Sequence, residues 1–160
     1  MAVARRVGSR PGVSGDLKPH DFLYGIAEAT KVLLPAELRN FQQRVRGPLI
    51  KLHYGDRHQH FEVCLRRSAG LVELGLHFES RDRARNAQLL DWFADELIWI
   101  KAELGEQTEA EPWDRGWTRI HRTVPLESLD AGFQHHLAEQ LAQAIQLLEP
   151  LRREAAESLG

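Results

Sequence analysis

The chain is 160 residues long, carries a formal net charge of −2, and is 42% hydrophobic and 28% charged. A chain of this size can bury enough apolar surface to fold as one domain, and its single cysteine, Cys64, excludes an intrachain disulfide. No apolar run approaches the ~20 residues that a membrane-spanning helix requires, and the first residues lack the apolar stretch of a secretory signal. The sequence therefore predicts a cytoplasmic protein without a membrane partner.

Residues 1–17 are rich in Gly, Ser, Pro and Arg, a composition that predicts a disordered tail. A single domain is predicted over residues 18–160. Because Arg5, Arg6 and Arg10 lie in the tail, the rest of the chain is net acidic. Phosphate recognition needs a concentrated basic face, so nucleic acid is not an expected partner.

Two helices are predicted at the start of the domain. Apolar residues recur at helical spacing from about residue 18 to Leu34, and Pro35 ends this run because its ring disfavours helical geometry in the preceding residue. A second, short helix is predicted from Pro35 through Val45, with Gly47-Pro48 as its stop.

From Leu49 the apolar period changes to two, which predicts strands over residues 49–54, 58–67 and 72–80. In the third strand, alternate residues form an apolar face and a polar face. The apolar face holds Val72, Leu74, Leu76 and Phe78, and the polar face holds Glu73, Gly75, His77 and Glu79. The pattern is typical of an antiparallel meander with one buried and one open face.

A long helix is predicted next, from residue 80 or 86 to Leu104, with Gly105 as its stop. Strands over residues 107–113 and 117–124 form a predicted hairpin. A last helix begins near Pro125 or Ser128 and bends or ends at Pro150, with a frayed helical continuation to Gly160 as the alternative for the tail. The predicted fold class is α+β: an antiparallel sheet of about five strands, a three-strand meander plus a hairpin, packed with helices in the order ααβββαββα.

Two histidines and two glutamates alternate along the second and third predicted strands. His60 and Glu62 share one face, His77 and Glu79 share another, and the faces coincide if these strands pair as a hairpin. Such a set can bind zinc or another divalent metal, and a metal-dependent hydrolase is one function that it would serve. The competing interpretation is a solvated sheet face with cross-strand charge pairs and no cofactor.

Further polar residues join this face if the strand over residues 117–124 belongs to the same sheet. Glu73, Arg119 and His121 would then lie close together as candidate binding residues, in a grouping that also suits acid–base chemistry. An open polar face, which most antiparallel sheets have, is the competing interpretation.

Trp92 and Trp99 lie seven residues apart on the predicted long helix and widen its apolar stripe. Tryptophan is enriched at protein interfaces, so both residues are candidate binding residues for a second copy of the chain or another partner. Packing within the core of the same chain is the alternative.

The element order resembles the small α+β fold of class I type III secretion chaperones over roughly residues 18–150. This resemblance involves no shared motif, so no functional residue is carried over. It implies a dimeric, non-enzymatic protein that binds extended segments of partner proteins. The segments VELGLHFES and WTRI and residues 92–105 are also similar to a bacterial domain of unknown function that occurs beside DNA-modification enzymes, a similarity that implies no reaction.

The sequence as a whole favours a non-catalytic interaction module, bacterial and homodimeric, with a protein or peptide as the further partner. The alternative is a metal-binding protein or metal-dependent hydrolase that uses His60, Glu62, His77 and Glu79.

Overall fold

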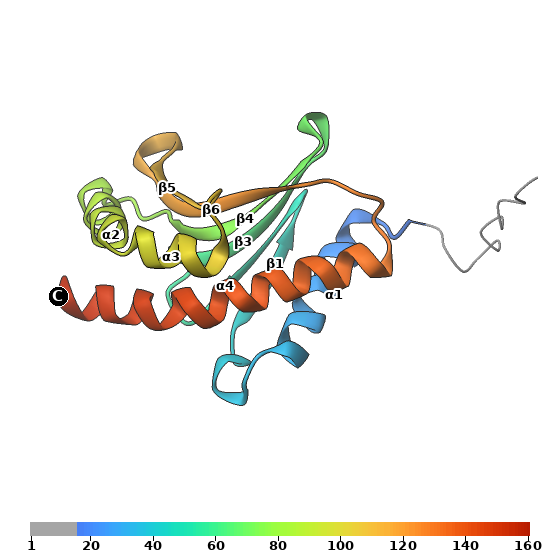
Figure 1. The fold of residues 1–160 in the computed structure, drawn as a ribbon, viewed down its shortest axis with the longest axis horizontal. Helices are drawn as coiled ribbons and strands as arrows, with labels where there is room; N and C mark the ends of the chain where they lie inside the picture. The colour runs from blue at the N-terminus through green and yellow to red at the C-terminus, as the bar shows by residue number, and fades with distance from the viewer. Residues whose placement is uncertain (1–15) are drawn as a thin grey trace, which may run out of the picture.

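Six antiparallel strands form one open sheet in the computed structural model, which describes residues 16–160 (Figure 1). The strands are β1 (Gln42–Arg46), β2 (Leu49–His53), β3 (Gln59–Arg66), β4 (Leu71–Phe78), β5 (Glu109–Pro112) and β6 (Thr118–Pro125), in the spatial order β1-β2-β3-β4-β6-β5. The predicted α+β class and antiparallel sheet are confirmed, with one strand more than predicted. Most of the predicted disordered tail, residues 1–17, lies outside the described residues.

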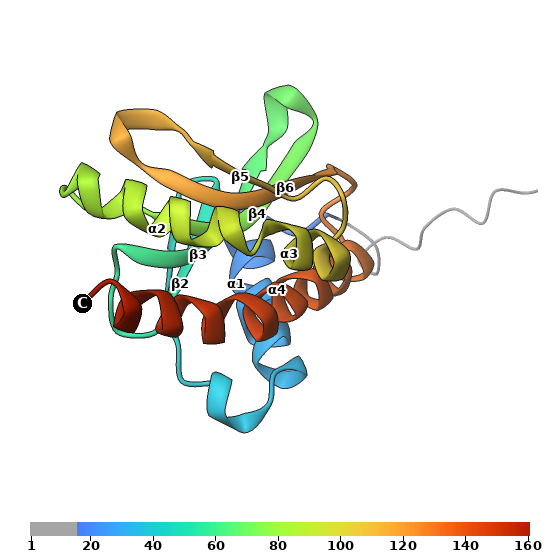
Figure 2. The same cartoon turned by 60° about the vertical axis from the view of Figure 1, so that its left-hand side comes forward.

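The helices lie together on one side of the sheet (Figures 1 and 2). They are α1 (Pro19–Leu33), α2 (Arg83–Asp95), α3 (Leu97–Leu104) and α4 (Ala131–Ser158). The sheet face toward them is apolar, because alternate residues of the central strands, such as Phe61, Val63, Leu74 and Leu76, enter the core. The opposite face carries the polar residues of the same strands.

The predicted helix from Pro35 through Val45 is wrong. This segment forms a single 3-10 turn at Ala36–Leu38 and then strand β1, which pairs with β2 across a tight turn that places Gly47 at φ 55°. Strand β1 reads QQRVR, with one apolar residue, so it shows no alternation from which a strand could be recognised. Backbone pairing at the edge of the sheet determines its conformation.

The predicted single helix up to Leu104 is divided into α2 and α3 at Glu96. No Gly or Pro marks the junction, so the sequence carries no signal for it. Both halves bury apolar residues in the same core, Phe93 from α2 and Ile100 from α3.

Helix α4 continues through Pro150 to Ser158, so an end of the helix at Pro150 is wrong and the predicted helical continuation of the tail is confirmed. A proline inside a helix removes one hydrogen bond, so other contacts must hold the last two turns. The fully buried carboxylate of Glu149 binds Arg152 at 2.6 and 2.8 Å, and Arg152 also donates to Gln59 of β3 at 3.0 Å. Of the helices in residues 16–160, none is both long and apolar enough to cross a membrane.

Candidate metal centre

The two predicted histidine–glutamate pairs meet on the polar face of the sheet. Strands β3 and β4 pair with His60 directly opposite His77, Glu62 follows two residues along β3, and Glu79 comes directly after β4. One ligand atom from each of the four side chains lies within 4.8 Å of all the others. The convergence predicted from the alternation is confirmed, and we call these four residues the His/Glu cluster.

Although no helix of residues 16–160 covers this face, the cluster is buried. His60, His77 and Glu62 are 1%, 2% and 5% exposed. The indole ring of Trp113, which follows β5, lies edge-on to the His77 ring at 5.6 Å, and Lys51 of β2 approaches Glu79 at 3.4 Å. At the cluster itself, the structure therefore replaces the expected solvated face with a desolvated site, in which charges interact more strongly than in water.

The tautomer of His60 is determined by a backbone carbonyl. Its Nδ1 lies 3.0 Å from the carbonyl oxygen of Arg57, which can only accept, so Nδ1 carries the hydrogen. Its Nε2 then points toward Glu62 at 3.3 Å and Glu79 at 3.6 Å. In a neutral ring Nε2 is a hydrogen-bond acceptor. His60 Nε2 and the carboxylates of Glu62 and Glu79 are then three acceptors that face one another, an arrangement that requires a proton or a metal cation between them. Metal-binding histidines commonly have their second ring nitrogen held in this way.

His77 lies between the same two carboxylates. Its Nδ1 is 3.0 Å from Glu79, and its Nε2 is 3.7 Å from Glu62. The rings of His60 and His77 are stacked, with centroids 5.5 Å apart and planes 16° from parallel. Two protonated rings stacked at this distance repel each other, whereas one divalent cation neutralises both carboxylates without that repulsion.

Both carboxylates of the cluster favour the charged form that a metal ligand requires. Burial opposes their ionisation, but when His60 also carries a proton on Nε2, its hydrogen bond to Glu62 and the charges of both histidines lower the pKa of Glu62 below its usual value. For Glu79, burial is outweighed by the hydrogen bond from His77 and the charges of His60, His77 and Lys51, so its pKa falls to about 2.

The predicted binding residues Glu73, Arg119 and His121 also come together, because β6 pairs with β4. Arg119 donates to Glu73 at 3.1 Å and to Glu111 at 2.9 and 3.1 Å, and Glu111 also lies 2.6 Å from His121 Nε2. The guanidinium of Arg119 lies over the Trp113 ring, 4.7 Å from its centroid. This group is paired internally, and it holds Trp113 against the His/Glu cluster.

Trp92 and Trp99, the other predicted binding residues, belong to different helices because of the junction at Glu96. Trp92 is partly buried and packs on the neighbouring ring of Phe93, with centroids 5.1 Å apart. Trp99 is 71% exposed and its neighbour Ile98 is 81% exposed. Trp99 therefore presents most of its ring to solvent, whereas Trp92 is partly covered by the core.

Cys64 is buried on the polar face, and its burial, together with the charges of Glu62 and Glu73, raises the pKa of its thiol to about 11. A nucleophilic cysteine requires a lowered pKa, so this side chain serves as a small buried residue of the strand.

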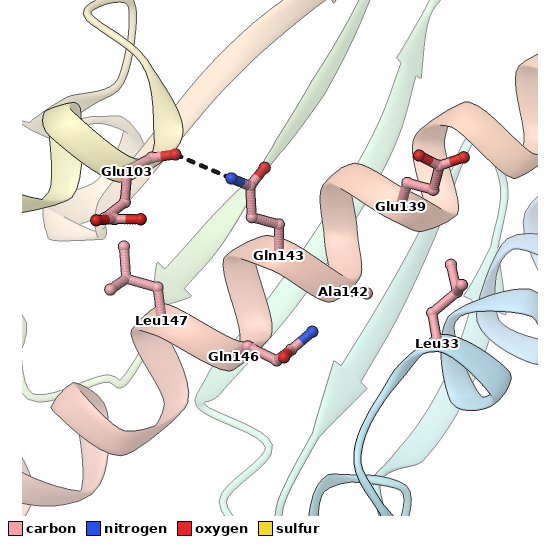
Figure 3. Close-up of a pocket in the computed structure, with 7 residues that line it drawn as sticks. All are labelled: Leu33, Glu103, Glu139, Ala142, Gln143, Gln146 and Leu147. Carbon is pink, nitrogen blue, oxygen red and sulfur yellow. Dashed lines mark hydrogen bonds between the residues drawn. The ribbon is translucent and has the colours of Figure 1, made fainter.

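A pocket of about 300 Å³ leads to the cluster, with His60 and Glu79 in its lining. A larger hollow of about 440 Å³ lies over α4, between Leu33 of α1 and Glu103 of α3 (Figure 3). Its side chains are apolar groups, amides and two separate carboxylates, and the amide of Gln143 already donates to the backbone of Glu103 at 2.9 Å. Its lining contains no histidine or cysteine, so of these two pockets it is the one beside the cluster that has metal-binding chemistry.

Compared with models of known protein families, with curated proteins and with solved structures, the chain matches none. The resemblance to type III secretion chaperones stays a prediction, and the element order on which it rested differs from the structure at residues 35–46.

Proposed function

We propose that this chain binds one divalent transition-metal ion through His60, Glu62, His77 and Glu79. The observation that carries the proposal is the orientation of His60, whose Nδ1 hydrogen is committed to the Arg57 carbonyl while Nε2 faces two buried carboxylates. Imidazole nitrogens combined with carboxylate oxygens suit Zn²⁺ and its neighbours Mn²⁺, Fe²⁺ and Ni²⁺. Mg²⁺ and Ca²⁺ prefer sites made of oxygen atoms alone.

The pocket gives this centre an opening to solvent, because it reaches His60 and Glu79. Catalytic metal sites keep a position for water or substrate, and a bound divalent ion would supply Lewis acidity and an activated water there. A metal-dependent hydrolase is accordingly the enzyme class that we propose. Its residues would hold the metal and exclude bulk water by the packing of Trp113.

The test is the metal content of protein purified without chelator, or dialysed against chelator and reloaded with Zn²⁺ or Mn²⁺. We expect one ion per chain by native mass spectrometry and elemental analysis. His60→Gln and His77→Gln should each abolish stoichiometric binding, because neither variant retains the full nitrogen donor set.

The matched control is His20→Gln, since His20 is exposed on α1, outside the cluster. Loss of the ion in this control would show that metal loss is unspecific. Full occupancy in the His60 and His77 variants, or an absence of binding by the reloaded native chain, would refute the proposed centre.

A second candidate function is self-association through the amino-terminal end of α3, favoured by the exposed neighbours Ile98 and Trp99. Large exposed apolar side chains, and tryptophan in particular, are enriched at interaction surfaces. If this surface forms a homodimer, Trp99→Ala should halve the mass measured by sedimentation without loss of the fold. Tyr24→Ala, at a half-exposed aromatic residue of α1, is the control and should leave the mass unchanged. A monomeric native chain, or a Trp99→Ala variant of unchanged mass, would exclude this interface.

A further inference from the structure

The pocket that leads to the His/Glu cluster is lined by basic side chains from three consecutive segments. They are Arg44 and Arg46 of β1, Lys51 and His53 of β2, and Arg57 and His58 of the connection between β2 and β3. The pairing of β1 with β2 brings the basic side chains of these two strands together. Arg44 is directly opposite Lys51, and Arg46 faces the same side as Arg44 because alternate residues of a strand share a face. A chain with a net negative charge thus concentrates positive charge at one place.

The three guanidinium groups of this pocket have no acidic partner in the part of the chain that the structure describes. Within residues 16–160, Arg44, Arg46 and Arg57 make no ion pair with an acidic side chain, whereas Lys51 is paired with Glu79. Asp56, the acidic residue of the same connection, accepts a hydrogen bond from the backbone N–H of His58 at 2.9 Å. Three like charges around one hollow repel one another, and an anion that enters the hollow removes this repulsion.

We propose that this pocket binds the dianionic phosphate group of a small phosphomonoester, and that such a compound is the substrate class of the proposed metal centre. A ligand with one carboxylate would balance only one of the three unpaired guanidinium charges, whereas a phosphate dianion balances two. The planar arrangement of N–H donors in arginine also matches the oxygens of a phosphate group. A volume of about 300 Å³ is at the lower end of the range for small-molecule sites. Because the basic groups surround one hollow rather than following a groove, they fit a single phosphate better than a nucleic-acid backbone.

The position of the pocket connects this anion site with the metal ligands. His60 and Glu79 belong both to the lining of the pocket and to the His/Glu cluster, so a bound phosphate group lies next to the proposed centre. The assignment of the phosphomonoester as substrate rests on the proposed metal function. The binding of phosphate by the arginines does not, since none of the three is a proposed metal ligand.

The experiment measures phenyl phosphate binding by calorimetry, first in protein kept free of metal by chelator. We expect saturable binding, and we expect Arg44→Gln combined with Arg46→Gln to weaken it at least about tenfold through the loss of charge-assisted hydrogen bonds. The control combines Arg67→Gln with Arg81→Gln, two exposed arginines outside the pocket, and should bind as the native chain does. Benzoate, an anion of lower charge, should bind at least about tenfold more weakly than phenyl phosphate.

Further measurements separate failure of the pocket from failure of the metal centre. After reloading with Mn²⁺, phenyl phosphate should bind more tightly to the native chain than it does without metal, whereas Mn²⁺ should not change the affinity of a His77→Gln variant, a ligand position outside the pocket lining, relative to that variant's own metal-free value. Absence of a metal effect together with intact metal-free binding would refute only the substrate role. The pocket itself is refuted if phenyl phosphate does not bind without metal, if the Arg44 and Arg46 variant binds normally, or if a single-stranded oligothymidylate binds while phenyl phosphate does not.

Discussion

Replacing Glu79 with glutamine is expected to lower the free energy of unfolding of the metal-free protein by about 3 kcal/mol near neutral pH. Burial opposes the charge of this carboxylate, but the hydrogen bond from His77 and the charges of His60, His77 and Lys51 lower its pKa from 4.5 to about 2. Glutamine has nearly the same shape and carries no charge, so the variant removes the interaction that produces this difference.

The pH dependence of this effect has a definite sign. A carboxyl group whose pKa is lower in the folded protein stabilises the fold at pH values above its unfolded pKa, and this contribution is lost as the pH falls through the folded pKa. The difference between the native chain and Glu79→Gln should therefore be complete above about pH 4.5 and vanish near pH 2.

Urea denaturation at a series of pH values, with chelator present throughout, measures this difference. The control is Glu157→Gln, at an exposed position near the end of α4, which should change stability by less than about 0.5 kcal/mol. A difference between the native chain and Glu79→Gln that does not vary with pH would show that the loss arises from packing and not from the charge.

Replacing Glu149 with leucine is expected to destabilise the protein by about 3–5 kcal/mol, because the buried guanidinium of Arg152 then loses its carboxylate partner. Glu149 is completely buried, and Arg152 contacts both of its oxygens, at 2.6 and 2.8 Å. This ion pair joins the residues on either side of Pro150 at the start of the last turns of α4, so we expect those turns to lose order first. Urea denaturation followed by circular dichroism measures both effects.

A double variant distinguishes the unpaired charge from the loss of one side chain. Removing both partners, with Glu149→Leu and Arg152→Leu, leaves no unpaired buried charge and should recover most of the stability. Glu154→Leu, at an exposed position of the same helix, provides the control. If the double variant is less stable than Glu149→Leu alone, the two side chains act independently of their ion pair.

The parts of the fold that the sequence predicts well are those where burial is periodic. Strand β4 alternates Val72, Leu74, Leu76 and Phe78 with polar residues, so its two faces can be assigned without a structure. The edge strand β1 buries too few apolar side chains for such a pattern, and pairing with β2 decides its conformation. At Pro150, the sequence leaves a bend, an end and a helical continuation open, because a local helix breaker does not show which contacts hold the turns that follow it.

The candidate site, too, could be predicted only where its residues lie on strands with a periodic pattern. The His/Glu cluster was predictable because each pair alternates on a recognisable strand, and one hairpin brings the two pairs together. The basic pocket was not, because Arg44 falls in the segment predicted to be a helix and Arg46 directly follows that segment. Net charge also concealed it, since an acidic total is compatible with a local concentration of arginine. Trp113 covers the cluster from a loop whose position depends on the pairing of β6 with β4.

Arg57 contributes different atoms to the two parts of the site. Its backbone carbonyl holds the ring of His60, while its side chain lines the basic pocket. Every amino acid has that carbonyl, so substitutions at this position change the chemistry of the pocket and leave the ligand geometry in place. Insertions or deletions between β2 and β3 displace the carbonyl itself. Variation in side-chain identity at residue 57 is therefore a route to altered ligand preference, whereas the length of this connection is constrained.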